Sequence, residues 1–237
     1  MPEPTHRPAP ATVAGWVGTA VMLVGLVAFV GIYDWVREGE DLAVLDQPLL
    51  DLLVSVRSPA LTWLLTAITT VSGPVVLPIL VASGGLVAGV RYGQWRSALL
   101  LVGAMATAAG VAMLIKVVTG RARPAEEFWV VPGAETSASF PSGHTVGAAT
   151  FLLVLGYLAW VNHPTLATAV RWFLAAVLGI GLVAFSRLYL GYHWLTDTVA
   201  AMALAVAVLG AVVVVDRRRA ADAFGRMLAG RRPGDGG

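Results

Sequence analysis

The chain has 237 residues, of which 57% are hydrophobic and 13% are charged, and its mean hydropathy is +0.77. This composition excludes an ordinary soluble domain and predicts an integral membrane protein. The sequence contains no cysteine, which excludes disulfides, thiolate catalysis and cysteine-bound metal, and its formal net charge of +2 is too small to indicate nucleic-acid binding.

Long apolar segments without charged residues recur along the chain. A run of about 20 such residues crosses the hydrocarbon core of a bilayer as a helix. Six spans are predicted, at about residues 12–33, 61–90, 97–118, 144–161, 166–185 and 193–215. Gly73-Pro74 and Pro78 lie inside the second span and predict a break or a kink there. The expected fold class is therefore all-α, an integral membrane bundle of six transmembrane helices that forms one domain over residues 12–215.

Three segments lie outside these spans. Residues 1–11 are rich in proline and are predicted to be a disordered tail, while residues 216–237 are predicted to be a basic tail that begins as a helix. Between the first two spans, the apolar pattern of residues 48–54 predicts a short interfacial helix with Asp46 as its N-cap. We expect this helix to be an amphipathic linker without a chemical role.

The placement of basic residues predicts how the chain is oriented, because cytoplasmic loops are enriched in Lys and Arg. If the N-terminus is cytoplasmic, most of the sixteen basic residues fall on that side, namely Arg7, Arg91, Arg96, Arg171, Arg217, Arg218, Arg219, Arg226, Arg231 and Arg232. Apart from Lys116, Arg123 and Arg187, which belong to the motifs described next, the outer side holds only Arg37, Arg57 and Arg121. We therefore expect a multi-pass protein of the cell membrane with both termini in the cytoplasm.

Three polar motifs fall on the predicted outer face. They are residues 116–124, the turn Pro141-Ser142-Gly143-His144, and residues 186–197. The turn precedes an apolar run, and the unpaired N–H groups and positive dipole end at the start of a helix favour a phosphate. In the third motif His193 and Asp197 are four residues apart, so on a helix the carboxylate would share a face with the imidazole and could orient it. Taken alone, such a pair is also typical of a structural contact or a proton relay.

Together the motifs have the pattern K-x6-RP, PSGH and SR-x5-H-x3-D, and the chain resembles the type 2 phosphatidic acid phosphatase (PAP2) superfamily of lipid phosphatases. The resemblance implies that His193 is a nucleophile that forms a phosphohistidine and that Asp197 orients it. It also implies that His144 acts first as general acid and then as general base. The alternative for His144 is a histidine that caps a span at the interface.

The resemblance further implies a phosphate-binding site made of Lys116, Arg123, Ser142, Gly143 and Arg187. Its three cationic side chains would neutralise the phosphoryl oxygens, so neither a metal ion nor another cofactor is expected. The acidic residues near the motifs are expected to face water, and these are Glu126, Glu127 and Glu135. Arg121 lies outside the pattern and has no expected role.

The expected function is that of a metal-independent phosphatase that acts on a lipid phosphate or pyrophosphate at the outer membrane face. Its expected partners are this lipid and the bilayer. Polyprenyl pyrophosphate ranks first among the substrates, followed by phosphatidylglycerol phosphate, phosphatidate and diacylglycerol pyrophosphate. Two alternatives remain at this point. One is a lipid phosphotransferase that uses the same site, and the other is a membrane transporter or scaffold that has this fold without the chemistry.

Overall fold

The computed structural model describes residues 10–229, and all the regular elements within them are helices. The α-helices are α1 (Pro10–Glu38), α2 (Asp46–Ser55), α3 (Pro59–Val71), α4 (Val76–Tyr92), α5 (Trp95–Thr119), α6 (Gly143–Asn162), α7 (Leu166–Tyr189) and α8 (Leu195–Ala229). Two short 3-10 helices are η1 (Asp41–Leu45) and η2 (Glu126–Phe128). The predicted all-α class is confirmed. The disorder predicted at the two ends lies outside the described residues, except that α1 already begins at Pro10.

The long helices agree with the predicted spans. Five of them, α1, α5, α6, α7 and α8, are long and apolar enough to cross a membrane. Helices α3 and α4 form a sixth candidate as a pair bent by 49°. The bend falls where Gly73-Pro74 interrupts the chain, as predicted. Pro78 lies in the first turn of α4, where its missing N–H removes no intrahelical hydrogen bond, so it causes no second break.

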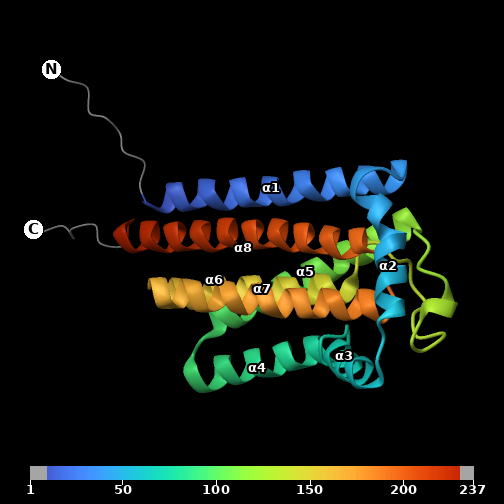
Figure 1. Ribbon diagram of the computed structural model, residues 1–237. Helices are drawn as coiled ribbons and strands as arrows, with labels where there is room; N and C mark the ends of the chain where they lie inside the picture. The colour runs from blue at the N-terminus through green and yellow to red at the C-terminus, as the bar shows by residue number, and fades with distance from the viewer. Residues whose placement is uncertain (1–9, 230–237) are drawn as a thin grey trace, which may run out of the picture.

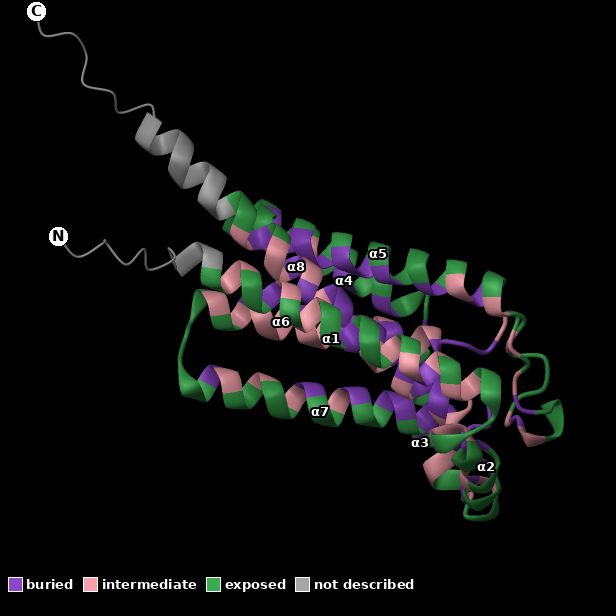
Figure 2. Cartoon of the chain, turned by 90° about the horizontal axis from the view of Figure 1, so that it is seen from above, coloured by how far each residue is buried: buried purple, intermediate pink, exposed green. Residues whose placement is uncertain are grey.

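Helix α8 is the central element of the bundle. In its most apolar stretch 56% of the residues are buried, whereas the corresponding share is 11% in α1 and 17% in α7. Figure 2 shows buried residues along α8 and at the end of the bundle near α2 and α3. Helix α1 packs closely on α8 because glycines remove side chains from the contact. A Cβ on Gly25 would lie 2.4 Å from the backbone nitrogen of Ala207, and one on Gly210 would lie 2.3 Å from that of Met22.

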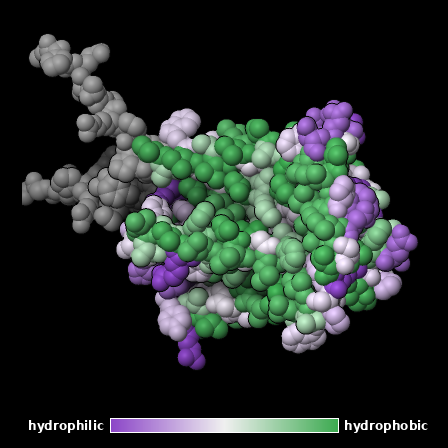
Figure 3. All heavy atoms as spheres, in the orientation of Figure 1, coloured by the Kyte–Doolittle hydropathy of each residue, from purple (hydrophilic) through white to green (hydrophobic). Residues whose placement is uncertain are grey.

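The outer surface of the bundle is apolar along its middle. Figure 3 shows hydrophobic residues over most of this face, with hydrophilic residues gathered toward the two ends. Large hydrophobic side chains are exposed on the outer helices, among them Trp16, Val27, Val90, Leu114 and Leu178. In water such a surface would be unfavourable, whereas lipid tails cover it at no cost. The protein is therefore a membrane protein.

The chain segments that carry the motifs meet at one end of the bundle. The ends of α5 and α7 and the starts of α6 and α8 lie there, opposite to the start of α1 and the end of α8 (Figure 1). Helix α2 runs across this end, so the short helix predicted between the first two spans is confirmed. The prediction that Asp46 is its N-cap is wrong, because Asp46 is the first helical residue and Leu45 is the N-cap. Several boundaries differ from the prediction, and α1 continues to Glu38 and α8 to Ala229. Helix α7 continues to Tyr189, and α8 begins only at Leu195.

Candidate active site

The three motifs surround one cavity of about 420 Å³. Lys116 projects from the last turn of α5, Arg123 from the loop that follows, and His144 from the first turn of α6. These three side chains line the cavity together with Glu135, Gly143 and His193. Three further predicted site residues are buried around this lining: Ser142, Arg187 and Asp197. The fold thus brings all eight predicted site residues to one place.

His193 is oriented from both sides of its ring. Its Nδ1 atom lies 3.1 Å from Oδ2 of Asp197, and its Nε2 atom lies 3.1 Å from Nη1 of Arg123. A guanidinium group can only donate, so Nε2 must be the accepting nitrogen and Nδ1 carries the proton that is donated to Asp197. The predicted contact between His193 and Asp197 is confirmed. The prediction that both belong to one helix is wrong, because His193 lies in the turn before α8.

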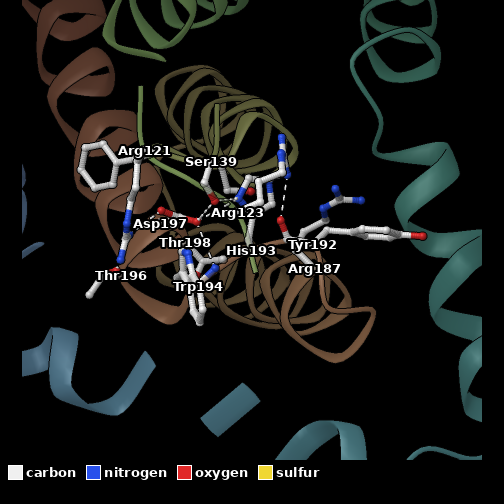
Figure 4. A network of polar contacts seen from close by, with 12 residues as sticks. Arg121, Arg123, Ser139, Arg187, Tyr192, His193, Trp194, Thr196, Asp197 and Thr198 are labelled. Atoms are coloured by element: carbon white, nitrogen blue, oxygen red, sulfur yellow. Dashed lines mark hydrogen bonds and ion pairs between the residues drawn. The ribbon is translucent and has the colours of Figure 1, made fainter. Parts of the chain in front are cut away.

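Asp197 is fully buried and each of its oxygens is bonded. Oδ2 also accepts the hydroxyl of Ser139 and, at 3.0 Å, the backbone N–H of Trp194. Trp194 precedes the first residue of α8, so Asp197 reaches back from the third helical position to the N-cap, as in a capping box. Oδ1 accepts Nη1 of Arg121 at 2.6 Å. Figure 4 shows the carboxylate between Arg121 on one side and Ser139 and His193 on the other. The start of α8 and the orientation of His193 therefore depend on the same side chain.

Arg121 and Asp46 extend this network, which the sequence did not predict. Nη2 of Arg121 donates to Oδ2 of Asp46 at 2.7 Å, and Asp46 is buried although it lies on the short helix α2. The expectation that this helix is only a linker is therefore incomplete, and Arg121 is not an ordinary surface charge. The sequence did contain one indication of a role for Arg121. In an extended segment, residues two apart point to the same side, so the side chains of Arg121 and Arg123 can approach the same group.

The cationic side chains are held by backbone carbonyl groups of the loop between α5 and α6. Lys116 Nζ donates to the carbonyls of Ala138 and, at 3.1 Å, Ser139. Arg123 donates through Nε to the carbonyl of Ser137 at 2.8 Å. Such contacts orient a cation without neutralising its charge, so they leave both side chains able to attract an anion in the cavity, and for Arg123 one such anion is the carboxylate of Glu135.

Arg187 is 2% exposed and is held between an aromatic ring and two polar side chains. Its Cζ atom lies 4.5 Å from the ring centroid of Tyr192, and Nη1 donates to Oγ1 of Thr69 at 2.8 Å. Its Nη2 atom forms an ion pair with Glu135.

Glu135 also lies 3.1 Å from Nη2 of Arg123. The expectation that Glu135 faces water is therefore wrong, because two buried guanidinium groups attract its carboxylate, whereas Glu126 and Glu127 are exposed as expected.

The start of α6 is only partly available to a ligand. Ser142 is fully buried, its N–H donates to the backbone carbonyl of Asp197 at 3.1 Å, and its hydroxyl accepts that of Thr145 at 3.1 Å. Ser142 therefore joins α6 to α8 and uses its N–H in doing so, which differs from the expected set of free N–H groups. Gly143 has open space where a Cβ would lie and borders the cavity. A phosphate could approach the backbone closely at this glycine.

The electrostatic surroundings of His193 favour its neutral form. Burial lowers its pKa well below the usual value of about 6.5, and the positive charges of Arg187, Arg123 and Lys116 lower this pKa further. A neutral imidazole whose Nδ1 proton is held by a carboxylate presents the lone pair of Nε2 as a nucleophile. Within residues 10–229, no cluster of three or more His, Cys, Asp or Glu side chains is arranged to hold a metal ion.

Comparisons with known proteins identify the same family as the motifs. The sequence model of the PAP2 superfamily matches residues 97–221. Phosphatidylglycerophosphatase B from Bacillus subtilis strain 168 is 30% identical over 164 residues, which cover 67% of this chain and 77% of that protein. Phosphatidylglycerophosphatase B from Escherichia coli K12 is 36% identical over 84 residues, which cover 35% of this chain and 31% of that protein.

Two solved structures have a similar fold. One is a transmembrane PAP2 type phosphatidylglycerolphosphate phosphatase from Bacillus subtilis, with a TM-score of 0.69 and 25% identity, covering 82% of this chain and 96% of that chain. The other is LpxE from Aquifex aeolicus, with a TM-score of 0.53 and 20% identity, covering 72% of this chain and 95% of that chain. The second likeness concerns the fold alone.

Proposed function

We propose that this chain, which belongs to the PAP2 superfamily and is a membrane phosphatase, hydrolyses a lipid phosphate or pyrophosphate through a phosphohistidine on His193. One observation carries the proposal. His193 lines the cavity, its Nε2 atom lies 3.1 Å from Nη1 of Arg123, which can only donate, and its Nδ1 atom lies 3.1 Å from Oδ2 of Asp197. This arrangement places a nucleophilic nitrogen next to a cationic side chain, and the cation can bind the phosphoryl group that the nitrogen attacks.

In the first step Nε2 of His193 attacks phosphorus. A nitrogen–phosphorus bond forms while the bond from phosphorus to the lipid oxygen, or to the bridging oxygen of a pyrophosphate, breaks. Arg123 transfers its hydrogen bond from Nε2 to a phosphoryl oxygen as the substrate enters. His144, which lines the same cavity, donates a proton to the leaving oxygen. Asp197 stabilises the positive charge that develops on the imidazole of His193.

In the second step water replaces the nitrogen. His144, now neutral, takes a proton from the water, whose oxygen bonds to phosphorus while the bond to Nε2 breaks. Phosphate leaves and His193 returns to its neutral form. Lys116, Arg123 and Arg187 attract the equatorial oxygens in both steps, which is the role that a metal ion has in other phosphatases. The proposed mechanism therefore uses no metal.

The shape of the cavity supports a lipid substrate. Beyond the polar cluster the cavity continues between α4, α5 and α6, where its lining is apolar and includes Leu77, Val81, Met105 and Val146. A hydrocarbon chain can lie there while the phosphate remains at the end of the bundle. The names of the Bacillus subtilis and Escherichia coli relatives favour phosphatidylglycerol phosphate as the first candidate. Polyprenyl pyrophosphate and phosphatidate are the next candidates.

We place the reaction on the outer membrane face. The site lies at the end of the bundle opposite to the start of α1 and the end of α8 (Figure 1). Six of the basic residues predicted to be cytoplasmic lie in helices α4, α5, α7 and α8 away from the site, and these are Arg91, Arg96, Arg171, Arg217, Arg218 and Arg219. The positive-inside rule therefore supports cytoplasmic termini and an extracytoplasmic site.

The test is phosphate release by the purified protein on a panel of these lipids in the presence of EDTA. We expect release from at least one lipid, inhibition by vanadate, and no release by His193→Ala. Activity that disappears in EDTA and returns with magnesium would reject the metal-free mechanism. A phosphotransferase would instead label an added acceptor lipid, and a transporter or scaffold would release no phosphate from any member of the panel.

A further inference from the structure

A chain of charged side chains connects helix α2 to the oxygen of Asp197 that does not face His193. Arg121 lies in the middle of this chain. Its Nη1 atom donates to Oδ1 of Asp197 at 2.6 Å, and its Nη2 atom donates to Oδ2 of Asp46 at 2.7 Å. Figure 4 shows Arg121 extended alongside Asp197 and Thr196. One guanidinium group thus bridges two carboxylates that are far apart in the sequence.

Asp46 also holds the start of α8 directly. Its Oδ1 atom accepts the backbone N–H of Thr196 at 3.0 Å, and its Oδ2 atom accepts the hydroxyl of Thr196 at 2.7 Å. The first N–H groups of a helix have no partner inside the helix, and a carboxylate at that end is favoured by the helix dipole. Asp46 therefore acts as a cap for α8 that comes from another helix. The residue it caps is the immediate neighbour of Asp197.

The arrangement is more than an ion pair that stabilises the fold. The side chain of Asp197 is completely buried and that of Asp46 is 7% exposed, so the charges of both carboxylates depend on Arg121. Asp197 uses Oδ2 to orient His193, and Arg121 fixes the position of its other oxygen. Rotation of the carboxylate would break the bond to Arg121 as well as the bond to His193. The angle at which Nε2 meets phosphorus thus depends on a group that touches neither His193 nor the cavity lining.

We propose that Arg121 and Asp46 are positioning residues for the hydrolysis, with Arg121 acting through Asp197 and Asp46 acting through Arg121. The inference rests on the proposed roles of His193 and Asp197. It assigns to α2 a function in catalysis: this helix, which crosses the end of the bundle, determines the orientation of the nucleophile. Neither residue contacts the substrate in this scheme, so their loss changes the chemical step and leaves lipid binding intact.

The experiment compares phosphate release by purified full-length variants. Arg121→Gln and Asp46→Asn are expected to lower kcat by about 10- to 100-fold, the range that loss of a group orienting a functional side chain from the outer shell costs in metal sites. KM and the inhibition constant of vanadate should stay within about twofold of the unchanged protein, because the phosphate-binding residues are untouched. Asp51→Asn is the matched control. Asp51 lies on the same helix, is exposed, and bonds only to Gln47 among the described residues.

A double mutant separates positioning from a loss of folding. If Asp46 acts through Arg121, adding Asp46→Asn to Arg121→Gln lowers kcat by less than about twofold further. If the two losses multiply, or if KM and vanadate inhibition change as much as kcat, the proposal is wrong and the residues only stabilise the fold. Full activity of Arg121→Gln would also overturn it. Asp197→Asn is measured in parallel, because full activity of this variant would reject the proposed site itself rather than the positioning role.

Discussion

Glu135 and Arg187 form an ion pair inside the proposed phosphate-binding site, between a loop carboxylate and a guanidinium group that is only 2% exposed. The second oxygen of Glu135 lies 3.1 Å from Nη2 of Arg123. A phosphoryl group would need these same N–H groups. The carboxylate therefore occupies positions that the substrate's oxygens take in the proposed mechanism, and it must give them up when substrate binds.

Glu135→Gln should bind vanadate more tightly, by about 3- to 10-fold, because the substitution removes a negative charge that competes for the same donors. Inhibition constants measured at several vanadate concentrations would show this. Glu127→Gln is the control, since Glu127 lies in the same loop and is exposed. Weaker vanadate binding by Glu135→Gln would contradict the prediction and indicate that Glu135 orients the arginines instead of competing with the phosphate.

His193→Ala should abolish phosphate release, because it removes the attacking nitrogen that Asp197 orients. Asp197→Asn should retain a small residual activity, since the nucleophile remains but its tautomer is no longer held. Rapid acid quenching of the unchanged protein with labelled lipid, followed by mapping of the label, measures the intermediate directly. Label on a residue other than His193 would overturn the assignment.

In the profile of kcat/KM against pH, the decrease on the acid side (the acid limb) should lie well below pH 6.5. Its position follows from the lowered pKa of His193, whose neutral form is the nucleophile and persists as the pH falls toward that pKa. The substitution Arg187→Gln removes a buried positive charge near His193. The pKa of His193 should therefore rise, and the acid limb should move to higher pH. Rates on a short-chain lipid between pH 4 and pH 9 test both statements. An unchanged acid limb in Arg187→Gln would show that His193 is not the group that titrates.

Gly25→Ala should destabilise the bundle by about 1–3 kcal/mol, because its Cβ would lie 2.4 Å from the backbone of α8 and the two helices would have to separate. Gly31→Ala is the control on the same helix, since a Cβ there meets no atom within 4 Å. Unfolding of both variants in detergent gives the comparison. Equal stability of the two would mean that α1 can move away from α8 without loss.

A cysteine at Glu127 should react with a membrane-impermeant thiol reagent in intact cells, whereas one at Gln94 should not. Glu127 is exposed at the end of the bundle that holds the site, and Gln94 is exposed in the turn between α4 and α5. The sequence contains no cysteine, so the background is silent. The reverse pattern would place the site on the cytoplasmic side and contradict the orientation inferred from the basic residues.

Several features of the protein could be predicted because they depend on neighbours in the sequence. The apolar length of each span, the break at Gly73-Pro74 and the grouping of the motifs at span ends are of this kind. The family pattern identified His144, His193 and Asp197, and the structure places them around one cavity or directly behind its lining. Charge alone suggested that Glu135 would face water, and that inference failed because the attraction of Arg187 and Arg123 is a tertiary effect.

The membrane class, the candidate spans and the histidines of the motifs could be predicted from the sequence, because hydropathy and motif spacing are properties of short segments. The contacts by which Arg121 joins Asp197 to Asp46 could be found only in the fold, because these residues lie 76 and 75 positions away from Arg121. Such a bridge forms only when the end of α5, the start of α8 and α2 are packed together. Burial then makes the pairing strong, because carboxylates removed from water need a cation within hydrogen-bond distance.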